Sequence, residues 1–577
     1  MTEAVTRARN VERRWVPRRA APPDASRLAA SAGVSEVVAG VLAARGVETE
    51  AEARALLEPT LGQLHDPYLM LGMREAVARV LRAVDAGERI LIYGDYDVDG
   101  TTGTVVLRRA LSFLGARTGY HVPHRFTEGY GIRRDVLERA KADGYSLVIS
   151  VDCGIRAFEP LEWARANGLD VIITDHHLPD DDEGAPPAFA VLNPNQKGCA
   201  YPDKNLAGVG VAFKLAHALF RERGLEAKVP GFLKVVAIGT VADVAQLTGE
   251  NRAIVALGLA DLQSAKNPGL RALMEVAGCG DGTGMRAFDI GFRLGPRINA
   301  AGRMDAARAV VELFETKSHQ EARTLAEHLD ARNRERREVQ QQVTERAAAE
   351  LELTGQEETA VVVVAGQGWH RGVIGLAASK LAERLQRPAV VISLDEDGAG
   401  HGSARSGDGF HMLDALTECA GLLEAFGGHA HAAGLAVRRE NVAELRRRLN
   451  EHAARVLCEG EGGQPCLEYD LELPASALSL GLCGELEALE PFGAGWPRPV
   501  FVTKNLRVVG EPRVLKGRHL KFGVTGGRGV YDCIWWGGAE RATATPRPGA
   551  RIELAYSVEA NCWNGNTRLQ LVVEDLK

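Results

Sequence analysis

Short runs of mostly hydrophobic residues, each followed by charged or imidazole side chains, dominate residues 86–315. Three of these runs are residues 90–93, 146–151 and 169–174. Apolar runs of this length are typical of parallel strands that are buried on both faces. Helix-like segments separate the runs, as they do in successive β-α-β units. The pattern therefore predicts an α/β domain built on a parallel sheet.

The pattern changes along the chain, and 577 residues are too many for a single hydrophobic core. Residues 1–85 are rich in Arg and Ala and predict a helical lead-in, with a helix over residues 74–86. Residues 316–353 contain neither Pro nor Gly. Their apolar positions recur at four-residue steps, which predicts one long bridging helix over residues 316–355. These positions are Leu325, Leu329, Val339, Val343, Ala347 and Leu351.

Two further patterns follow the bridging helix. Residues 356–460 contain apolar runs at 359–365 and 389–394 that are separated by a helical segment at 373–385. This alternation predicts a second, smaller α/β domain. Residues 461–577 consist of short alternating runs bounded by turn residues, which predicts a small β-barrel. Its expected strands are 500–509, 519–524, 530–536, 551–559 and 568–574.

Acidic and imidazole side chains follow the three apolar runs of the larger domain. Asp95, Asp97 and Asp99 follow the first run, and Asp152 ends the second. The third run ends in Asp175, His176 and His177. Strand ends of a parallel sheet meet at one edge, where ligands bind. A helix over residues 101–114 should begin beside this edge and favour an anion there.

So many carboxylates at one edge would repel one another unless cations lay between them. Asp243 ends an apolar helical segment and joins the set. Carboxylate oxygens with one imidazole suit Mg²⁺ or Mn²⁺ better than zinc. Two cations about 3.5–4 Å apart would activate water and hold a phosphate. We therefore predict a site for two divalent ions, Mn²⁺ or Mg²⁺.

Composition adds limits to this interpretation. The chain is 45% hydrophobic and 25% charged, with a net charge of −7. No apolar run approaches the roughly 18 residues of a membrane span. Nine cysteines without paired Cys-x-x-Cys spacing argue against a disulfide framework. We expect a cytoplasmic protein that does not bind membranes.

Basic residues gather locally at 7–19, 332–337 and 513–521 despite the negative net charge. The last group lies near Trp535, Trp536 and Trp563, and aromatic residues mixed with basic ones are typical of proteins that bind single strands. For any one of these tryptophans, burial in the barrel core is an equally open alternative.

Several motifs resemble those of the DHH phosphoesterase superfamily. They are GDYDVDG at 94–100, VDCG at 151–154, DHH at 175–177 and GTVAD at 239–243. The stretch FGGHAHAAG at 426–434 resembles the signature of the DHH-associated domain. Residues 125–131, 206–212, 294–303 and 369–375 resemble motifs of bacterial single-strand-specific exonucleases within that superfamily. The resemblance runs from about residue 60 to the end, and the last domain resembles an OB fold.

The resemblance implies an α/β fold in which residues 86–315 are the DHH catalytic domain. The long helix joins this domain to a DHH-associated domain at 356–460, and an OB-like domain follows at 461–577. The resemblance also implies a metal-binding role for one group of residues, with Asp152 as the bridge between two ions. These are Asp97, Asp99, Asp152, His176 and Asp243, with Asp95 as a further candidate. His177 is implied near the scissile phosphate, so that the catalytic set comprises the five ligands and His177.

A second group is expected to contact DNA. Its members are Arg125, Tyr130, Arg297, Asn299, Arg303, His370, Ser403, Arg405, His429, Arg518 and Lys521. Arginine suits this role because its planar fork grips two phosphate oxygens. Surface or interdomain ion pairs remain an alternative for these residues, and Tyr130 could instead be a core tyrosine.

The implied activity is hydrolysis of single-stranded DNA from its 5′ end to 5′-mononucleotides, in recombination and repair. The implied partners are single-stranded DNA, a single-strand-binding protein and a helicase. One alternative is a DHH phosphodiesterase for short oligonucleotides or cyclic dinucleotides. Another is a DNA-binding scaffold that has lost its metals. Comparing digestion of a long strand with that of a dinucleotide would separate the two enzymes.

Overall fold

The computed structural model describes residues 13–19, 25–180, 182–279, 284–304, 307–407, 409–459, 466–527, 529–541, 545–563 and 565–577. The chain forms two compact units. We call residues 50–334 and 488–498 the first unit, and the rest of the described chain the second unit.

The first unit contains the predicted parallel sheet. Its strands are β2 (Arg89–Tyr93), β3 (Arg117–His121), β4 (Tyr145–Ser150), β5 (Asp170–Thr174) and β6 (Ala190–Leu192). They follow the order β3-β2-β4-β5-β6, and every pair is parallel. The three apolar runs correspond to β2, β4 and β5, so this part of the sequence prediction is confirmed.

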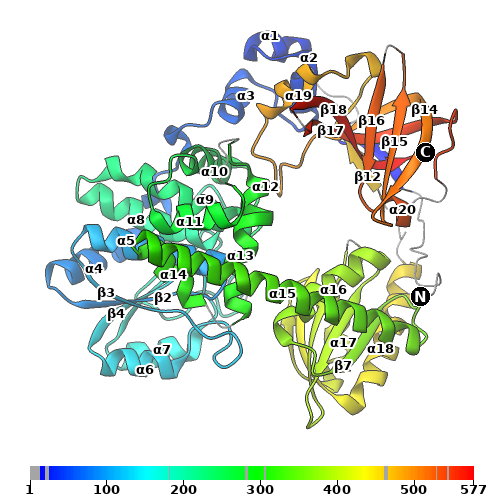
Figure 1. Cartoon of the computed structure of the whole chain (residues 1–577). Helices are drawn as coiled ribbons and strands as arrows, with labels where there is room; N and C mark the ends of the chain where they lie inside the picture. Colours follow the sequence, from blue (N-terminus) through cyan, green and yellow to red (C-terminus); the bar gives the residue numbers. More distant parts are fainter. Residues whose placement is uncertain are drawn as a thin grey trace. The chain divides into compact units, whose positions relative to one another are not determined.

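Helices cover both faces of this sheet (Figure 1). On one face, α6 (Arg134–Ala142) and α7 (Phe158–Ala166) pack against Leu91, Val148 and Val171. On the other face, Ile92, Ile149 and their neighbours pack against three helices. These are α4 (Met73–Asp85), α5 (Val98–Phe113) and α8 (Gly208–Glu222). Successive strand residues point to opposite faces, so an unbroken apolar run supplies both cores.

The predicted start of α5 is wrong by three residues. The helix begins at Val98 rather than at residue 101, and Asp97 caps it by accepting a hydrogen bond from the Gly100 N–H at 3.0 Å. Asp is a favoured N-cap because its side chain satisfies a free N–H of the first turn. Asp97 and Asp99 are therefore positioned by the N-terminus of this helix.

A second, mainly helical core completes the first unit. Its apolar residues come mainly from helices between residues 237 and 329. Its elements are α9 (Leu233–Ala242), α10 (Gly249–Leu262), α11 (Pro268–Val276), α12 (Ala287–Asp289), one π-helical turn η5 (Ile290–Leu294), α13 (Gly295–Arg303) and α14 (Ala307–Glu315). Helix α3 (Glu50–Leu57) precedes the sheet. Residues 488–498 are anchored here because the buried Arg252 donates to the carbonyl oxygens of Leu489, Glu490 and Pro491.

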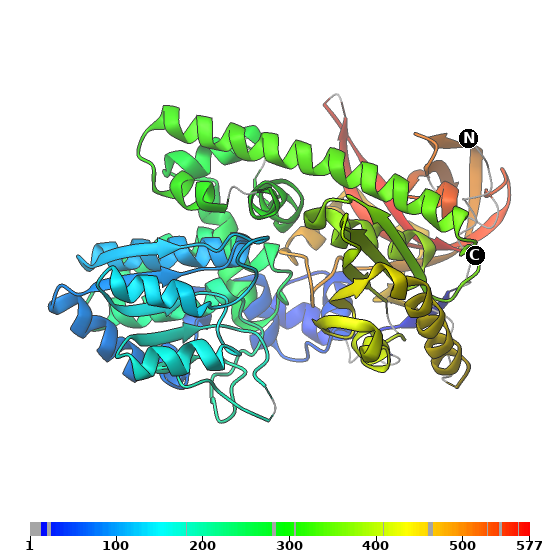
Figure 2. The same cartoon turned by 90° about the horizontal axis from the view of Figure 1, so that it is seen from below.

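The predicted bridging helix is a single helix, α15 (His319–Leu353), of 35 residues (Figure 2). At 1.5 Å per residue it is about 50 Å long. Ala322, Ala326 and Leu329 belong to the helical core of the first unit. Val343, Ala347 and Leu351 belong to a core of the second unit.

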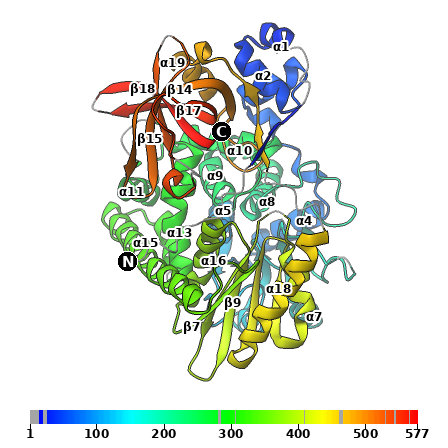
Figure 3. The ribbon, with the colours of Figure 1, turned by 90° about the vertical axis from the view of Figure 1, so that its right-hand side faces the viewer.

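The smaller α/β domain lies in the second unit (Figure 3). Its sheet has the order β10-β11-β9-β8-β7, with only β7 and β8 parallel. The C-terminal half of α15 and α16 (Arg371–Leu385) cover one face, and α17 (Met412–Glu418) and α18 (Val442–Glu459) cover the other. The strands are β7 (Val362–Gln367), β8 (Ala389–Leu394), β9 (Ala399–Arg405), β10 (Leu423–Gly428) and β11 (Ala432–Arg438).

The C-terminal segment forms the predicted barrel. Strand β14 pairs with both β15 and β17, which closes the order β14-β15-β16-β18-β17. The strands are β14 (Phe501–Leu515), β15 (His519–Thr525), β16 (Val530–Trp535), β17 (Arg551–Trp563) and β18 (Asn566–Leu576), with β13 (Leu471–Glu472) beside β14. The short helices here are α19 (Leu480–Glu487) and α20 (Gly538–Arg541).

One strand near the N-terminus was not expected. β1 (Arg14–Pro17) pairs in parallel with β12 (Cys466–Tyr469), and helices α1 (Ala25–Ala32) and α2 (Glu36–Ala44) follow. Among the described residues, no single helix has the length and hydropathy to cross a membrane, and α1 with α2 reaches that threshold only as a pair bent by 116°.

Candidate metal centre

Four segments of the first unit deliver acidic or imidazole groups to one place. Asp95, Asp97 and Asp99 lie between β2 and the first turn of α5, Asp152 follows β4, and His176 and His177 follow β5. Asp243 is the residue at which α9 ends. Each of these residues lies at the end of a strand or at a terminus of a helix, where its side chain can face the edge of the sheet.

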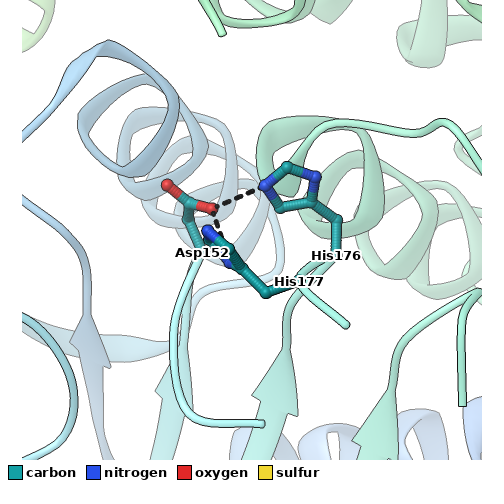
Figure 4. Close-up of side chains that lie close together, drawn as sticks. All are labelled: Asp152, His176 and His177. Atoms are coloured by element: carbon teal, nitrogen blue, oxygen red, sulfur yellow. Dashed lines mark ion pairs between the residues drawn. The ribbon is translucent and has the colours of Figure 1, made fainter. Parts of the chain in front are cut away.

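His176 lies at the centre of this arrangement. Its Nε2 is 3.2 Å from Asp152 Oδ1, 3.8 Å from Asp99 Oδ2 and 3.9 Å from Asp243 Oδ2. Figure 4 shows Asp152 with His176 and His177 turned toward its carboxylate. Three sets have ligand atoms within 4.8 Å of one another. They are Asp152 with His176 and His177, Asp99 with His176 and Asp243, and Asp95 with Asp97 and Asp152.

The electrostatics of the cluster show a deficit of positive charge. Burial and then the Asp97 charge raise the pKa of Asp99 to about 7. Burial and then the charges of Asp99 and Asp97 raise the pKa of Asp243 to about 9. Burial and neighbouring carboxylates also hold the pKa values of Asp95 and Asp152 well above their usual range. Like charges in a buried site disfavour ionisation in this way.

The unsatisfied atoms of the cluster fit divalent cations. Asp95 Oδ1 and Asp152 Oδ1 are buried and accept no hydrogen bond within the described part of the chain. Buried carboxylate oxygens without a donor are costly unless a metal coordinates them. Burial and the charge of His177 lower the pKa of His176 to about 4, so its imidazole is neutral and able to bind a metal. Oxygen ligands with one neutral imidazole are the donor set that Mn²⁺ and Mg²⁺ accept.

The N-terminus of α8 supports two of these carboxylates. The backbone N–H groups of Gly208 and Val209 donate to Asp99 at 2.6 and 2.7 Å. A Cβ built on Gly208 would lie 2.7 Å from both Cβ and Oδ1 of Asp152, so a glycine is needed for this approach. Asp152 itself has a left-handed φ of 61°. Left-handed non-glycine residues that persist in a buried setting are concentrated at functional sites.

Sequence reasoning missed the residues that hold the two histidines. Asp175 is fully buried and accepts hydrogen bonds from the backbone N–H groups of Ile155, His176 and His177. Its Oδ1 also lies 2.8 Å from His177 Nδ1. Burial raises the pKa of Asp175, but the hydrogen bond and charge of His177 and the backbone N–H donors together outweigh it, so the net pKa is lowered. The position of Asp175 in the DHH motif was the available signal.

Two asparagines and a tyrosine complete this support. The Asn193 and Asn195 side-chain amides donate to the carbonyl oxygens of His177 and His176, each at 2.8 Å. The Tyr130 hydroxyl donates to the Asp152 carbonyl oxygen at 3.1 Å and lies 3.2 Å from His177 Nδ1. Because its side chain is 52% exposed, Tyr130 is not a core tyrosine.

The remaining first-unit candidates have structural partners. Asn299 Oδ1 accepts from the Val98 N–H at 3.2 Å and so fixes the start of α5. Arg297 forms an ion pair with Asp330 at 2.9 Å, which was the alternative for this residue. The Arg125 guanidinium lies over the Tyr96 ring at 4.7 Å. Arg303 ends α13, and its charge acts on the same tyrosine.

The second-unit candidates fall into two groups. At the start of α16, His370 caps the helix, and a Cβ on Gly375 would lie 3.0 Å from Ser403 Oγ and 3.1 Å from an Arg405 guanidinium nitrogen. His429 is exposed at the end of β10. In the barrel, Arg518 is exposed and Lys521 Nζ is 3.9 Å from Asp532 Oδ2.

The barrel tryptophans divide between the two interpretations. Trp535 is buried, with 4% of its surface exposed, so for this residue the core interpretation holds. Trp536 is 56% exposed, and its ring meets His519 edge-on at 4.9 Å. The Trp563 side chain lies outside the described residues, as do the basic positions 7–12.

The protein families that match this chain correspond to its three successive domains. Residues 89–240 match the DHH family, N-terminal domain; residues 358–455 match the DHHA1 domain; and residues 469–575 match the RecJ OB domain. The single-stranded-DNA-specific exonuclease RecJ of Bacillus subtilis (strain 168) is 39% identical over 94% of this chain and 68% of its own length.

Two solved structures agree with this. The structure of RecJ in complex with Mn²⁺ from Thermus thermophilus superposes with a TM-score of 0.83 at 30% identity, covering 99% of this chain and 80% of that one. The Mg²⁺ complex of the same protein gives a TM-score of 0.78 at 29% identity, covering 98% and 78%. Both structures contain a divalent ion, Mn²⁺ or Mg²⁺, and these are the ions that the donor set of the cluster suits.

Proposed function

Because the chain belongs to the RecJ family of single-stranded-DNA-specific exonucleases, we propose that it hydrolyses single-stranded DNA from the 5′ end to 5′-mononucleotides. The observation that carries the proposal is the convergence of acidic groups and a neutral imidazole around His176, with two buried carboxylate oxygens left without donors. A scaffold without metals would have no reason to keep these oxygens unsatisfied. The OB domain and the length of the matched chain favour a long DNA substrate over a cyclic dinucleotide.

Five residues would hold two divalent cations. They are Asp97, Asp99, Asp152, His176 and Asp243, with Asp95 beside them. Bound Mn²⁺ or Mg²⁺ supplies an activated water and neutralises charge on the phosphate. Asp152 is suited to a bridging role because it alone belongs to two of the three close sets through a carboxylate.

His177 would act on the leaving group. Asp175 fixes its ring, and the hydrogen bond and charge of Asp175 outweigh burial so that the pKa of His177 is raised. A protonated imidazole beside Asp152 can donate a hydrogen bond or a proton to the departing 3′ oxygen. Tyr130 limits the rotation of the same ring through its hydroxyl group.

The other candidate residues would bind the strand. Arg125 and Arg303 in the first unit, and Ser403, Arg405, His370 and His429 in the second, offer donors for phosphate oxygens. Arg518, Lys521 and Trp536 offer the barrel a basic and aromatic surface. Contacts with phosphates and base faces carry little sequence information, so we expect little sequence preference.

We also propose the setting in which the enzyme works. Family membership supports a role in recombination and repair in the cytoplasm. A single-strand-binding protein that holds the substrate and a helicase that produces it are the partners this role requires. A pull-down with each purified partner at physiological salt tests this part of the proposal independently of activity.

The catalytic proposal is tested with end-labelled strands. A 5′-labelled single strand should release labelled mononucleotide at once, whereas a 3′-labelled strand should shorten progressively. A matched duplex and a dinucleotide should resist. Asp152→Asn and His176→Ala should lose at least about 100-fold in kcat, while Asp143→Asn, an exposed acid of the same unit, should behave as wild type. Near-full activity in the first two variants would overturn the metal-site assignment.

A further inference from the structure

Two phenylalanines lie exposed and stacked on the surface of the first unit. Phe288 and Phe292 are 56% and 64% exposed, and their ring centroids are 4.6 Å apart at an interplanar angle of 25°. They are four residues apart, on α12 and on the π-helical turn η5, so they share one face. Large aromatic side chains are normally mostly buried, and π-helical turns occur frequently at functional sites. An exposed aromatic pair, one member of which lies on such a turn, indicates a binding surface.

The segment that carries the pair adjoins the metal centre. A Cβ built on Gly291 would lie 3.8 Å from Val241, and one on Gly295 would lie 3.4 Å from Ala242. Val241 and Ala242 immediately precede Asp243. The phenylalanines therefore stand on a segment packed against the residues next to Asp243.

The same segment also contacts the loop on the other side of the centre. Asn299 binds the Val98 N–H, and a Cβ on Gly302 would lie 2.3 Å from the Tyr96 carbonyl oxygen. Residues 286–303 thus pack against the residues that precede Asp243 and against the loop that carries Asp97; we call this segment, which includes the aromatic pair, the wall.

The charge of this wall indicates the class of ligand. Residues 286–303 contain four arginines and one acid, Asp289, in a chain whose net charge is −7. Three of the arginines have an acidic neighbour: Arg286 lies 3.8 Å from Glu490, Arg293 lies 3.3 Å from Asp289, and Arg297 lies 2.9 Å from Asp330. A basic segment with open aromatic rings is the combination that binds single-stranded nucleic acid, because bases stack on the rings and phosphates approach the arginines. An apolar protein partner would not require the positive charge.

We propose that Phe288 and Phe292 form a base-stacking platform for the DNA strand whose backbone enters the metal centre. The inference rests on the proposed function and adds a binding subsite to it. Every base has a π-face, so the platform accepts any sequence. It holds the strand next to Asp243 while the phosphate is cleaved, and it acts on substrate binding rather than on the chemical step.

Variants of the pair and single abasic sites in the substrate test the platform together. The double variant Phe288→Ala/Phe292→Ala should raise KM about tenfold and leave kcat nearly unchanged. The double variant Phe288→Trp/Phe292→Trp should keep the wild-type KM, because indole also stacks. Phe189→Ala is the matched control, since Phe189 is 43% exposed beside the start of β6, away from the strand ends that carry the site.

The abasic site is moved one position at a time from the 5′ end of a single strand. At one position the abasic site should raise the KM of the wild type to that of the double Ala variant. The same abasic substrate should not raise the KM of the double Ala variant further. An unchanged KM in the Ala variant, or abasic effects that simply add to it at every position, would overturn the platform.

Two controls separate other causes of failure. Mn²⁺ affinity and thermal unfolding of the Ala variant should match those of the wild type. If that variant does not fold, the Trp variant and the abasic series decide, and a raised KM in the Trp variant counts against the platform. A wild-type protein without activity on single strands refutes the proposed function itself, whereas an active wild type with insensitive variants refutes only the platform.

Discussion

Replacing Gly208 by Ala should disturb the metal centre without replacing any proposed ligand. Gly208 opens α8, and its N–H donates to Asp99. The added methyl group would lie 2.7 Å from both Cβ and Oδ1 of Asp152, closer than carbon atoms approach in folded proteins. Asp152 is buried with only 3% of its surface exposed, so it cannot turn away into solvent. The start of α8 or Asp152 must therefore move.

The size of the effect follows from two terms. Forcing an extra methyl group into a packed site costs about 1–3 kcal/mol of folding stability. Disturbing the groups that orient a metal ligand lowers metal affinity by about 10–100-fold, which corresponds to about 1.4–2.8 kcal/mol. We expect kcat/KM at limiting Mn²⁺ to fall by about the same factor and to recover partly at saturating Mn²⁺.

Gly210→Ala provides the matched control on the same helix. The three atoms nearest to a Cβ there would all belong to the Leu206 side chain, the closest at 3.4 Å, which is an ordinary contact. Alanine also favours the helix by up to about 1 kcal/mol. Mn²⁺ titration by calorimetry and exonuclease assays across a Mn²⁺ series would compare the two variants. If Gly208→Ala binds Mn²⁺ as the wild type does, or if Gly210→Ala loses as much, the packing argument is refuted.

Three other predictions concern charge in the first unit. Asp175→Asn removes the anionic partner of His177, so kcat should fall about 10–100-fold while Mn²⁺ affinity, measured by calorimetry, changes far less. Lys214→Met leaves the fully buried Glu250 without its ion-pair partner, and urea unfolding should show a loss of about 3–5 kcal/mol; the double variant Lys214→Met/Glu250→Gln should recover most of it. Chelation by EDTA should abolish exonuclease activity. Restoring Mn²⁺ to a hundred times its Kd should stabilise the protein by about 2.7 kcal/mol, as measured by scanning calorimetry, and Asp152→Asn should not show this gain.

The sheet and the barrel could be predicted because their signals are local. β2, β4 and β5 are unbroken apolar runs, and an acidic or imidazole residue directly follows each run. The ends of parallel strands meet at one edge whatever the details of the loops. The grouping of Asp152 with His176 therefore followed from order along the chain alone.

The supporting contacts could not be predicted, because they join side chains to backbone atoms of distant segments. Asn193 holds a histidine carbonyl group, and Asn299 holds the N–H of Val98 across 201 residues of chain. Nothing in residue type or spacing distinguishes such an asparagine from one on the surface. The pairing of Arg14 with Cys466, 452 residues apart, was equally invisible in the sequence.

The start of α5 shows a second limit of prediction from the sequence. The residues Asp95, Tyr96 and Asp97 lack any apolar period and so suggest a loop, yet Asp97 is the cap that begins the helix. The error matters for function because Asp99 thereby lies in the first helical turn, facing the N-terminus of α8.

A comparison of Asp175 with Asp152 shows where in the site cations are needed. Both carboxylates are buried at ends of neighbouring strands. Asp175 receives three backbone N–H groups and an imidazole, and its pKa is lowered. Asp152 keeps one oxygen without a hydrogen-bond donor, and its pKa is raised. The protein thus satisfies the carboxylate that positions His177 and leaves unsatisfied the one that faces His176. Positive charge is missing at that second position, and a pair of divalent ions placed there would supply it.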